Sequence, residues 1–275
     1  MPLLQSLSSG VSALQQFQQE LDVIGNNIAN VATTGYKGAD VEFEDALSQT
    51  MQGAGATGSM QVGTGVDTAS ISNRFTQGAI NPTGNPTDLA ISGSGFFLVR
   101  NSATNAQYAT RAGSFSVDPS GYLVSNGLRV QGYSDAGLTT LGDLKIDNTG
   151  APGGDAAAVQ SWHFDNDGNI TVTLTDNTTF TRGQVLLQNF QSPQMLVKEG
   201  ESLYSGITAA GPLAQPVAPN TNGVGKLEVG ALEGSNVDLT TELSNLITTQ
   251  RAFEANSKVI TTSDDVLQTL VNLKR

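Results

Sequence analysis

The fold is decided at the start of the chain, where residues 1–30 read MPLLQSLSSGVSALQQFQQELDVIGNNIAN. Apolar residues recur there at spacings of three, four or seven, which predicts an amphipathic α-helix with a coiled-coil-like period. The residues of this stripe are Leu4, Leu7, Val11, Leu14, Leu21, Ile24 and Ile28. Glutamines at positions 15, 16, 18 and 19 occupy another face, and the stripe is expected to end at Gly25-Asn26-Asn27.

The C-terminal segment repeats this design. Asp238 is a plausible N-cap for a helix that runs to about Leu273 without an internal Gly or Pro. After Leu239, its apolar side carries Leu243, Leu246, Phe253, Ile260, Leu267 and Leu270. A lone amphipathic helix is marginal in water, so each stripe needs a partner. We expect both stripes to form an assembly interface, either with each other or with neighbouring copies; a helical hairpin within one globular molecule is the alternative.

The middle of the chain reads as β structure. Short runs rich in Val, Ile, Leu and Phe alternate with Gly, Asn, Asp or Pro, and two turns predict hairpins, 118–121 (DPSG) and 166–169 (NDGN). The expected strands are 71–75, 89–91, 96–99, 115–117, 122–124, 170–174 and 185–190. Residues 51–65 are rich in Gly, Ala, Ser and Thr and are expected to be a flexible insertion.

These patterns predict an α+β fold in three parts. Residues 1–35 and 237–275 form a helical core domain with its two helices paired in a coiled-coil-like manner. Residues 36–75 and 208–236 form an extended connecting region, the latter marked by three prolines, and residues 76–207 form a β-rich outer domain.

Composition narrows the possible partners. The net charge is -12, so the chain is not expected to neutralise the phosphates of a nucleic acid. The sequence also contains no cluster of Lys or Arg of the kind that binds an anionic membrane surface. Cysteine is absent, which excludes disulfides and thiolate metal sites. Residues 1–19 contain no Lys or Arg, so a Sec-type signal peptide is not expected, and no apolar run is long enough to span a membrane.

The sequence gives little support for a catalytic, metal-binding or phosphate-binding motif. The single histidine, His163, lies beside the single tryptophan, Trp162, and is best read as a surface or packing residue. Residues 165–169 (DNDGN) place glycine fourth rather than sixth, so they predict a turn instead of a calcium loop. Gly63-Thr64-Gly65 and Gly93-Ser94-Gly95 lack the rest of a phosphate-binding fingerprint and are also read as turns. No catalytic, cofactor or metal site is expected, and the chain is predicted not to be an enzyme.

Several longer motifs resemble one family. They are 21–30 (LDVIGNNIAN), 33–37 (TTGYK), 85–97 (NPTDLAISGSGFF), 108–115 (YATRAGSF), 118–124, 130–133, 250–258 (QRAFEANSK) and 267–273 (LQTLVNL). In this order they resemble the bacterial flagellar rod and hook proteins across nearly the whole chain. The resemblance implies a self-assembling tube of identical copies, with the terminal helices around an export channel and the β-rich domain outside.

The same resemblance implies further partners and a location. Adjacent rod, junction or cap proteins and the type III export apparatus would contact the chain, which would leave the cell without a cleaved signal peptide. Residues 183–190 (GQVLLQNF), 269–273 and Gly25-Asn26-Asn27-Ile28 favour a short, extracellular hook protein that transmits motor torque. The short chain favours the alternative, a distal rod protein of the basal body. A secreted β-rich binding module, such as an adhesin, is the alternative from another class, and a hydrolase has almost no residue support.

Overall fold

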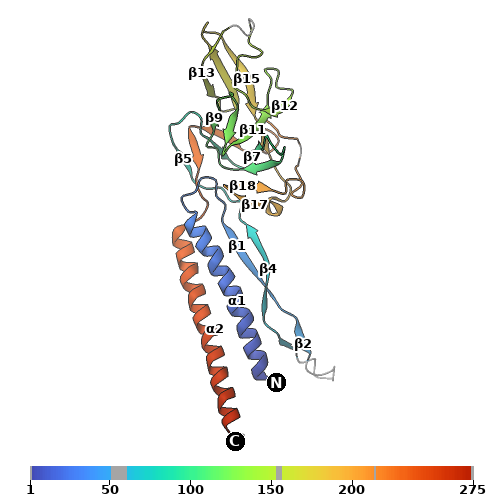
Figure 1. Cartoon of the computed structure of the whole chain (residues 1–275), viewed down its shortest axis with the longest axis vertical. Helices are drawn as coiled ribbons and strands as arrows, with labels where there is room; N and C mark the ends of the chain where they lie inside the picture. The colour runs from blue at the N-terminus through green and yellow to red at the C-terminus, as the bar shows by residue number, and fades with distance from the viewer. Residues whose placement is uncertain (1, 51–60, 153–156, 214, 274–275) are drawn as a thin grey trace. The chain divides into compact units, whose positions relative to one another are not determined.

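A computed structural model describes residues 2–50, 61–152, 157–213 and 215–273. The fold is α+β, with a helix at each end of the described chain and a mainly β middle (Figure 1). The chain divides into two compact units. The helical unit comprises Met1–Val31, Gly38–Arg74 and Val237–Arg275, and the β unit comprises Ala32–Lys37 and Phe75–Asn236.

The N-terminal helix, α1, spans Pro2–Ala29 and continues through the glycine and asparagines where it was expected to end. The reason is local hydrogen bonding. Asn27 Nδ2 donates to the Ala39 carbonyl at 2.9 Å, and the Ala39 N–H donates to Asn27 Oδ1 at 3.1 Å. Asn30 Nδ2 donates to the Asn26 carbonyl at 2.9 Å, which satisfies an acceptor of the last turn.

The C-terminal helix, α2, spans Leu239–Leu273. The predicted N-cap is confirmed, because Asp238 Oδ1 accepts hydrogen bonds from the N–H groups of Thr240 (2.8 Å) and Thr241 (3.1 Å). Neither described helix combines the length and apolar character needed to cross a membrane.

Residues 38–74 belong to the helical unit as a hairpin. Its strands are β1 (Ala39–Asp45), β2 (Ser48–Thr50), β3 (Gln61–Gly63) and β4 (Val66–Asn73). Strand β1 pairs antiparallel with β4, and β2 with β3. Of the expected flexible insertion 51–65, residues 51–60 lie outside the described residues, whereas residues 61–63 form β3.

The β unit contains the remaining strands. They are β5 (Ile80–Pro82), β6 (Leu89–Ser92), β7 (Phe96–Arg100), β8 (Gln107–Thr110), β9 (Ser116–Val117), β10 (Leu123–Ser125), β11 (Leu128–Tyr133), β12 (Leu141–Asp143), β13 (Val159–Phe164), β14 (Asn169–Leu174), β15 (Thr179–Val185), β16 (Leu187–Gln188), β17 (Val197–Gly200), β18 (Leu203–Ser205), β19 (Lys226–Val229) and β20 (Ala231–Glu233), with a 3-10 turn η1 (Pro193–Met195).

One antiparallel sheet organises this unit, in the order β13-β14-β15-β11-β7-β8-β18-β17. Both predicted hairpin turns are confirmed, since 118–121 joins β9 to β10 and 166–169 lies between β13 and β14. Residues 208–236 differ from the expected extended connector, because β19 pairs with β6 and β20 pairs with β5. The three prolines lie before residue 220, and the short strands that follow them carry too few residues to show a clear pattern.

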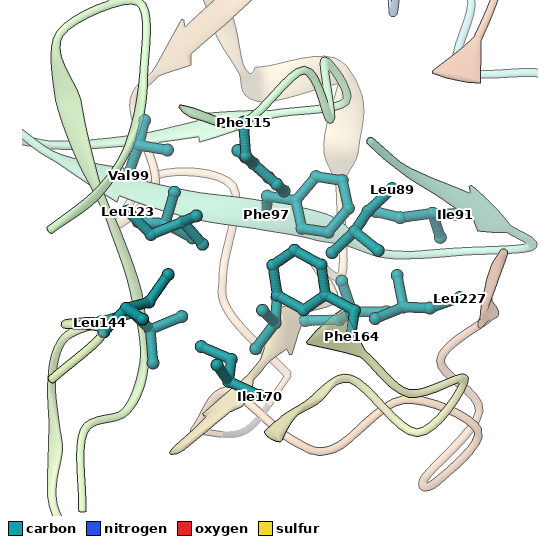
Figure 2. Packing of buried hydrophobic residues seen from close by; sticks show 14 of the residues in the cluster. Leu89, Ile91, Phe97, Val99, Phe115, Leu123, Leu144, Phe164, Ile170 and Leu227 are labelled. Atoms are coloured by element: carbon teal, nitrogen blue, oxygen red, sulfur yellow. The ribbon is translucent and has the colours of Figure 1, made fainter. Parts of the chain in front are cut away.

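The core of the β unit lies on both sides of β7. Phe97 and Val99 pack into the larger cluster, where the Phe97 and Phe115 rings meet edge to face at 5.0 Å (Figure 2). Phe96 and Leu98 point the other way, into a second cluster with Tyr204. Because strand side chains alternate between faces, the continuous apolar run of β7 identifies it as a central strand covered on both sides. Burying each such Phe or Leu stabilises the fold by about 1.5–3 kcal/mol.

Candidate assembly interface

The terminal helices lie side by side and run in opposite directions (Figure 1). Near one end, a Cβ added to Gly10 would lie 3.2 Å from Ile260 Cγ1. Further along, the Thr249 hydroxyl donates to the Glu20 carboxylate. The missing side chain at Gly10 therefore brings the helix backbones close together beside Ile260.

The predicted stripe of α1 is partly enclosed. Ile24 is buried, and Leu7, Leu14, Leu21 and Ile28 are half-buried. Val11 is 42% exposed, and the side chain of Leu4 lies outside the described residues.

The predicted stripe of α2 divides into two groups. Leu246, Phe253, Ile260 and Leu267 recur every seven residues and are half-buried. Leu243 and Leu270 are exposed, the latter at 51%, and so stand outside the contact within the molecule.

The same face of α2 has a polar half that the apolar pattern did not predict. Glu242, Thr249 and Ser263 are the buried residues of α2, and they also follow a seven-residue period, three or four positions from the apolar row. Thr249 contacts Glu20, while the Glu242 carboxylate lies 3.8 Å from an Arg74 guanidinium nitrogen. A search for apolar residues alone cannot find them, although their spacing was present in the sequence.

Another row of apolar residues on α2 faces outward. Val259, Val266 and Leu273 are exposed and again recur every seven residues. An ordered apolar row of this kind is typical of a surface that another helix covers.

The glutamine face of α1 is the docking face of the hairpin. Gln16 is buried, and its Nε2 donates to Asp67 Oδ1 at 3.4 Å, while its Oε1 contacts the Thr68 hydroxyl. The Phe17 and Phe43 rings meet edge to face at 6.3 Å. Gln16 and Phe17 therefore contact the hairpin, whereas Gln15, Gln18 and Gln19 of the predicted polar face are exposed.

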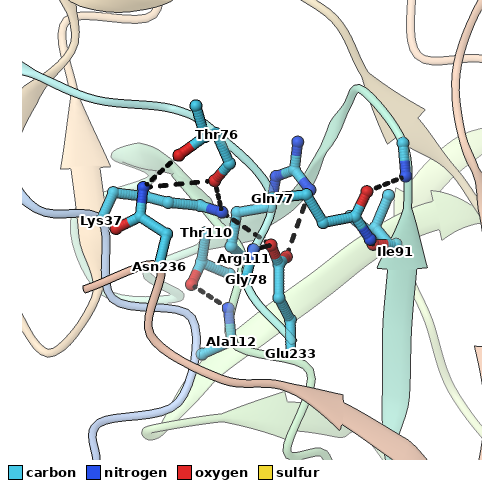
Figure 3. A network of polar contacts seen from close by, with 11 residues as sticks. Lys37, Thr76, Gln77, Gly78, Ile91, Thr110, Arg111, Ala112, Glu233 and Asn236 are labelled. Atoms are coloured by element: carbon cyan, nitrogen blue, oxygen red, sulfur yellow. Dashed lines mark hydrogen bonds and ion pairs between the residues drawn. The ribbon is translucent and has the colours of Figure 1, made fainter. Parts of the chain in front are cut away.

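A cluster of buried charges forms a second site, within the β unit (Figure 3). Glu233 and Lys37 are fully buried, and Lys37 Nζ donates to Glu233 Oε1 at 2.6 Å and to the Thr76 carbonyl at 2.7 Å. Arg111 Nη1 donates to Glu233 Oε2 at 3.2 Å, and the Gly78 N–H donates to Oε1 at 2.9 Å. One carboxylate thus binds three segments that are distant in sequence.

Burial and ion pairing act in opposite directions on the cations of this cluster. Burial lowers the pKa of Lys37 and of Arg111, and the Glu233 carboxylate opposes both shifts. Both cations depend on Glu233, because an unpaired buried charge is costly. Lys37 and Thr76 also adjoin the boundaries between the units, at 37/38 and 74/75, so the cluster holds the chain where it enters and leaves the β unit.

The remaining predicted features have ordinary structural roles. His163 is an exposed residue of β13, and residues 165–169 form the turn into β14. Gly93 and Gly95 have φ of 117° and 129° between β6 and β7, which fits the predicted turn.

A helix pair with an outward apolar row, joined to a β-rich body, defines the class as a structural protein that associates with other chains. Family models match three parts of the chain: Flagella basal body rod protein at residues 7–37, Flagellar hook protein FlgE/F/G D1 domain at 90–172, and Flagellar basal body rod FlgEFG protein C-terminal at 228–273.

Curated relatives cover the whole chain. The flagellar basal-body rod protein FlgG of Bacillus subtilis (strain 168) is 40% identical over 280 residues, which are 99% of this chain and 100% of the relative. The protein of the same name from Buchnera aphidicola subsp. Schizaphis graminum is 36% identical over 98% of this chain and 100% of the relative. The chain therefore belongs to the flagellar basal-body rod and hook protein family, and it is a structural component of the flagellar axis and not an enzyme.

Similarity to a hook protein is partial. The flagellar hook protein FlgE of Borreliella burgdorferi is 46% identical over 140 residues, which are 48% of this chain and 31% of the relative. The comparisons consequently favour the rod alternative over the predicted hook protein. The motifs that suggested a hook are short, and short motifs do not separate members of one family.

Proposed function

We propose that the chain is a distal rod subunit of the flagellar basal body. This proposal rests on how much of the chain each relative matches. The two rod proteins match 99% and 98% of the chain, whereas the hook protein matches 48% of it.

In this proposal, copies of the chain build a helical tube through their terminal helices. The two seven-residue rows of α2 support a coiled-coil-like seam with α1 on one side and a contact with a neighbouring copy on the other. Contacts between different surfaces of identical chains build an open helical assembly where the rotation between copies does not close into a ring, and this is the case that we propose. The proposed interface comprises the two predicted stripes together with Val259, Val266 and Leu273.

The proposed domain roles follow from the tube. The helical core domain, 1–35 and 237–275, would surround an export channel, and the β-rich domain would lie outside it. The adjacent rod, junction or hook proteins and the type III export apparatus are the proposed partners. Export without a cleaved signal peptide is part of this proposal.

Electron microscopy of basal bodies from a deletion strain tests the assignment. A distal rod subunit predicts a shortened rod without a hook, and complementation with the chain restores both. A full-length rod that lacks only the hook would contradict the rod assignment and would support the assignment as a hook protein.

A further inference from the structure

The β unit contains a pocket of about 290 Å³ on one face of β7, β8 and β11. Leu98, Leu141, Ile207 and Pro212 make it apolar, and Gln107 and Gln131 add amides. Pockets for drug-sized ligands span roughly 300–1,000 Å³. The pocket lies at the lower end of this range and is large enough to take an apolar side chain.

The strands that line the pocket also carry positive charge. Arg100 and Arg129 face each other across β7 and β11, and each lies two residues from a lining residue, Leu98 and Gln131, on the same face. Both pair with Asp143, at 2.7 Å from Arg100 and 3.1 Å from Arg129. Two partly exposed guanidinium groups thus share a single carboxylate, and this group has a net positive charge.

The hairpin presents the complementary chemistry. Leu47, two residues after the end of β1, is 89% exposed. Residues 39–73 contain Asp40, Glu42, Glu44, Asp45 and Asp67 and no Lys, Arg or His, and the next residue, Arg74, pairs with Asp40 at 3.2 Å. Glu44 and Asp67 lie opposite each other in the β1–β4 register, where like charges repel. An exposed Leu alone needs no explanation. An exposed Leu close to Glu44 and Asp45, which form no ion pair among the described residues, matches an apolar pocket with a basic rim.

We propose that Leu47 of one copy inserts into this pocket of a neighbouring copy, with Asp45 facing Arg100 and Arg129. The inference rests on the proposed assembly function and names a contact within it. Leu47 and the pocket lie on different surfaces of the same chain. The contact between copies is therefore heterologous and can repeat along a helical tube. The apolar insertion supplies affinity, and the charges fix orientation.

Because the chain has no cysteine, cross-linking can test this contact directly. Tubes are assembled from a mixture of Leu47→Cys chains and Gln107→Cys chains and are then oxidised. A disulfide needs Cβ atoms about 3.5–4.5 Å apart, so a mixed dimer forms only if the two surfaces meet between copies. The matched control replaces Gln107→Cys with Ser161→Cys, an exposed position on the edge strand β13.

We expect the Leu47–Gln107 dimer to exceed the Ser161 control by at least tenfold. Tubes that form normally but give equal yields would overturn the contact and leave the proposed function intact. Failure of the unmodified chain to form tubes would instead overturn the proposed function, and the contact with it.

A charge exchange provides an independent test that does not depend on cysteine geometry. Asp45→Lys or Arg100→Glu alone should reduce tube formation several-fold, and the two together should restore it. Leu47→Asp should reduce tube formation while leaving the unfolding of the monomer unchanged, because the side chain is exposed there. Additive losses without restoration would contradict the pairing.

Discussion

At the scale of single residues, the Glu233 carboxylate pairs with both buried cations of the cluster in the β unit. Replacing it with Gln leaves Lys37 and Arg111 as buried cations without a carboxylate. We expect Glu233→Gln to lower the free energy of unfolding by about 3–5 kcal/mol. Urea denaturation followed by the fluorescence of Trp162, the only tryptophan, measures the change.

The control for this variant is Glu254→Gln, whose unfolding is followed by circular dichroism because Glu254 lies on α2 in the helical unit and Trp162 in the β unit. Glu254 pairs with Arg251 at 3.0 Å, but the side chains are 61% and 76% exposed. Its loss should change stability by less than about 1 kcal/mol. Equal losses of stability in the two variants would contradict the claim that burial makes the Glu233 ion pairs more important for stability than an exposed pair.

Glu20 predicts a pH dependence of the helical unit. Burial raises its pKa above the ordinary 4.5, and the Thr249 hydrogen bond only partly offsets this. A raised pKa means that the folded state binds the proton more tightly, so the contribution of Glu20 to stability is greatest below pH 4.5 and is lost as pH rises through the folded pKa. Glu20→Gln should therefore stabilise the helix pair at neutral pH and lose this advantage in acid. Thermal unfolding by circular dichroism at pH 4 and pH 7 checks it; a variant less stable at pH 7 would contradict it.

At the scale of elements, the sequence pattern predicted the structures that form within a single continuous segment of the chain. Both helices and the Asp238 cap follow from local patterns, as do the two hairpin turns. The docking of the hairpin on α1 could not be predicted, because Gln16 and Thr68 are 52 positions apart and neither belongs to an apolar pattern. Strands β19 and β20 were missed because they are short and follow a stretch rich in proline.

Gly65 tests the docking of the hairpin. Its φ is +134°, and an added Cβ would lie 2.2 Å from Ser12 Oγ, which accepts a hydrogen bond from the Val66 N–H at 3.3 Å. Gly65→Ala should separate the hairpin from α1 and speed hydrogen exchange at Val66. Gly63→Ala is the control, since the nearest atom to its Cβ would be 3.6 Å away. Equal exchange in both variants would contradict a close contact at Gly65.

Two neighbouring positions on α2 separate folding from assembly. Leu267 is half-buried on the face toward α1, whereas Val266 is exposed on the outward row. Leu267→Asp should weaken the helix pair by about 1–3 kcal/mol and also impair assembly. Val266→Asp should impair assembly alone. Thermal unfolding and sedimentation of both variants measure the two effects, and normal assembly of Val266→Asp would exclude the outward row from the interface.

At the scale of the whole molecule, long motifs identified the family, but short ones misdirected the choice of member. The buried cluster around Glu233 escaped prediction because Lys37 and Glu233 are 196 positions apart, and charge in a sequence does not reveal burial. The paired stripes, by contrast, already predicted helical ends whose apolar residues need partners.

The central claim is that these helical ends join copies of the chain into the rod. Electron microscopy of a deletion strain, complemented with the full chain or with chains lacking residues 1–30 or 240–275, tests it most directly. We predict full-length rods from the full chain and none from either truncated chain, although the β unit stays folded in both. Full-length rods from both truncated chains would contradict the claim.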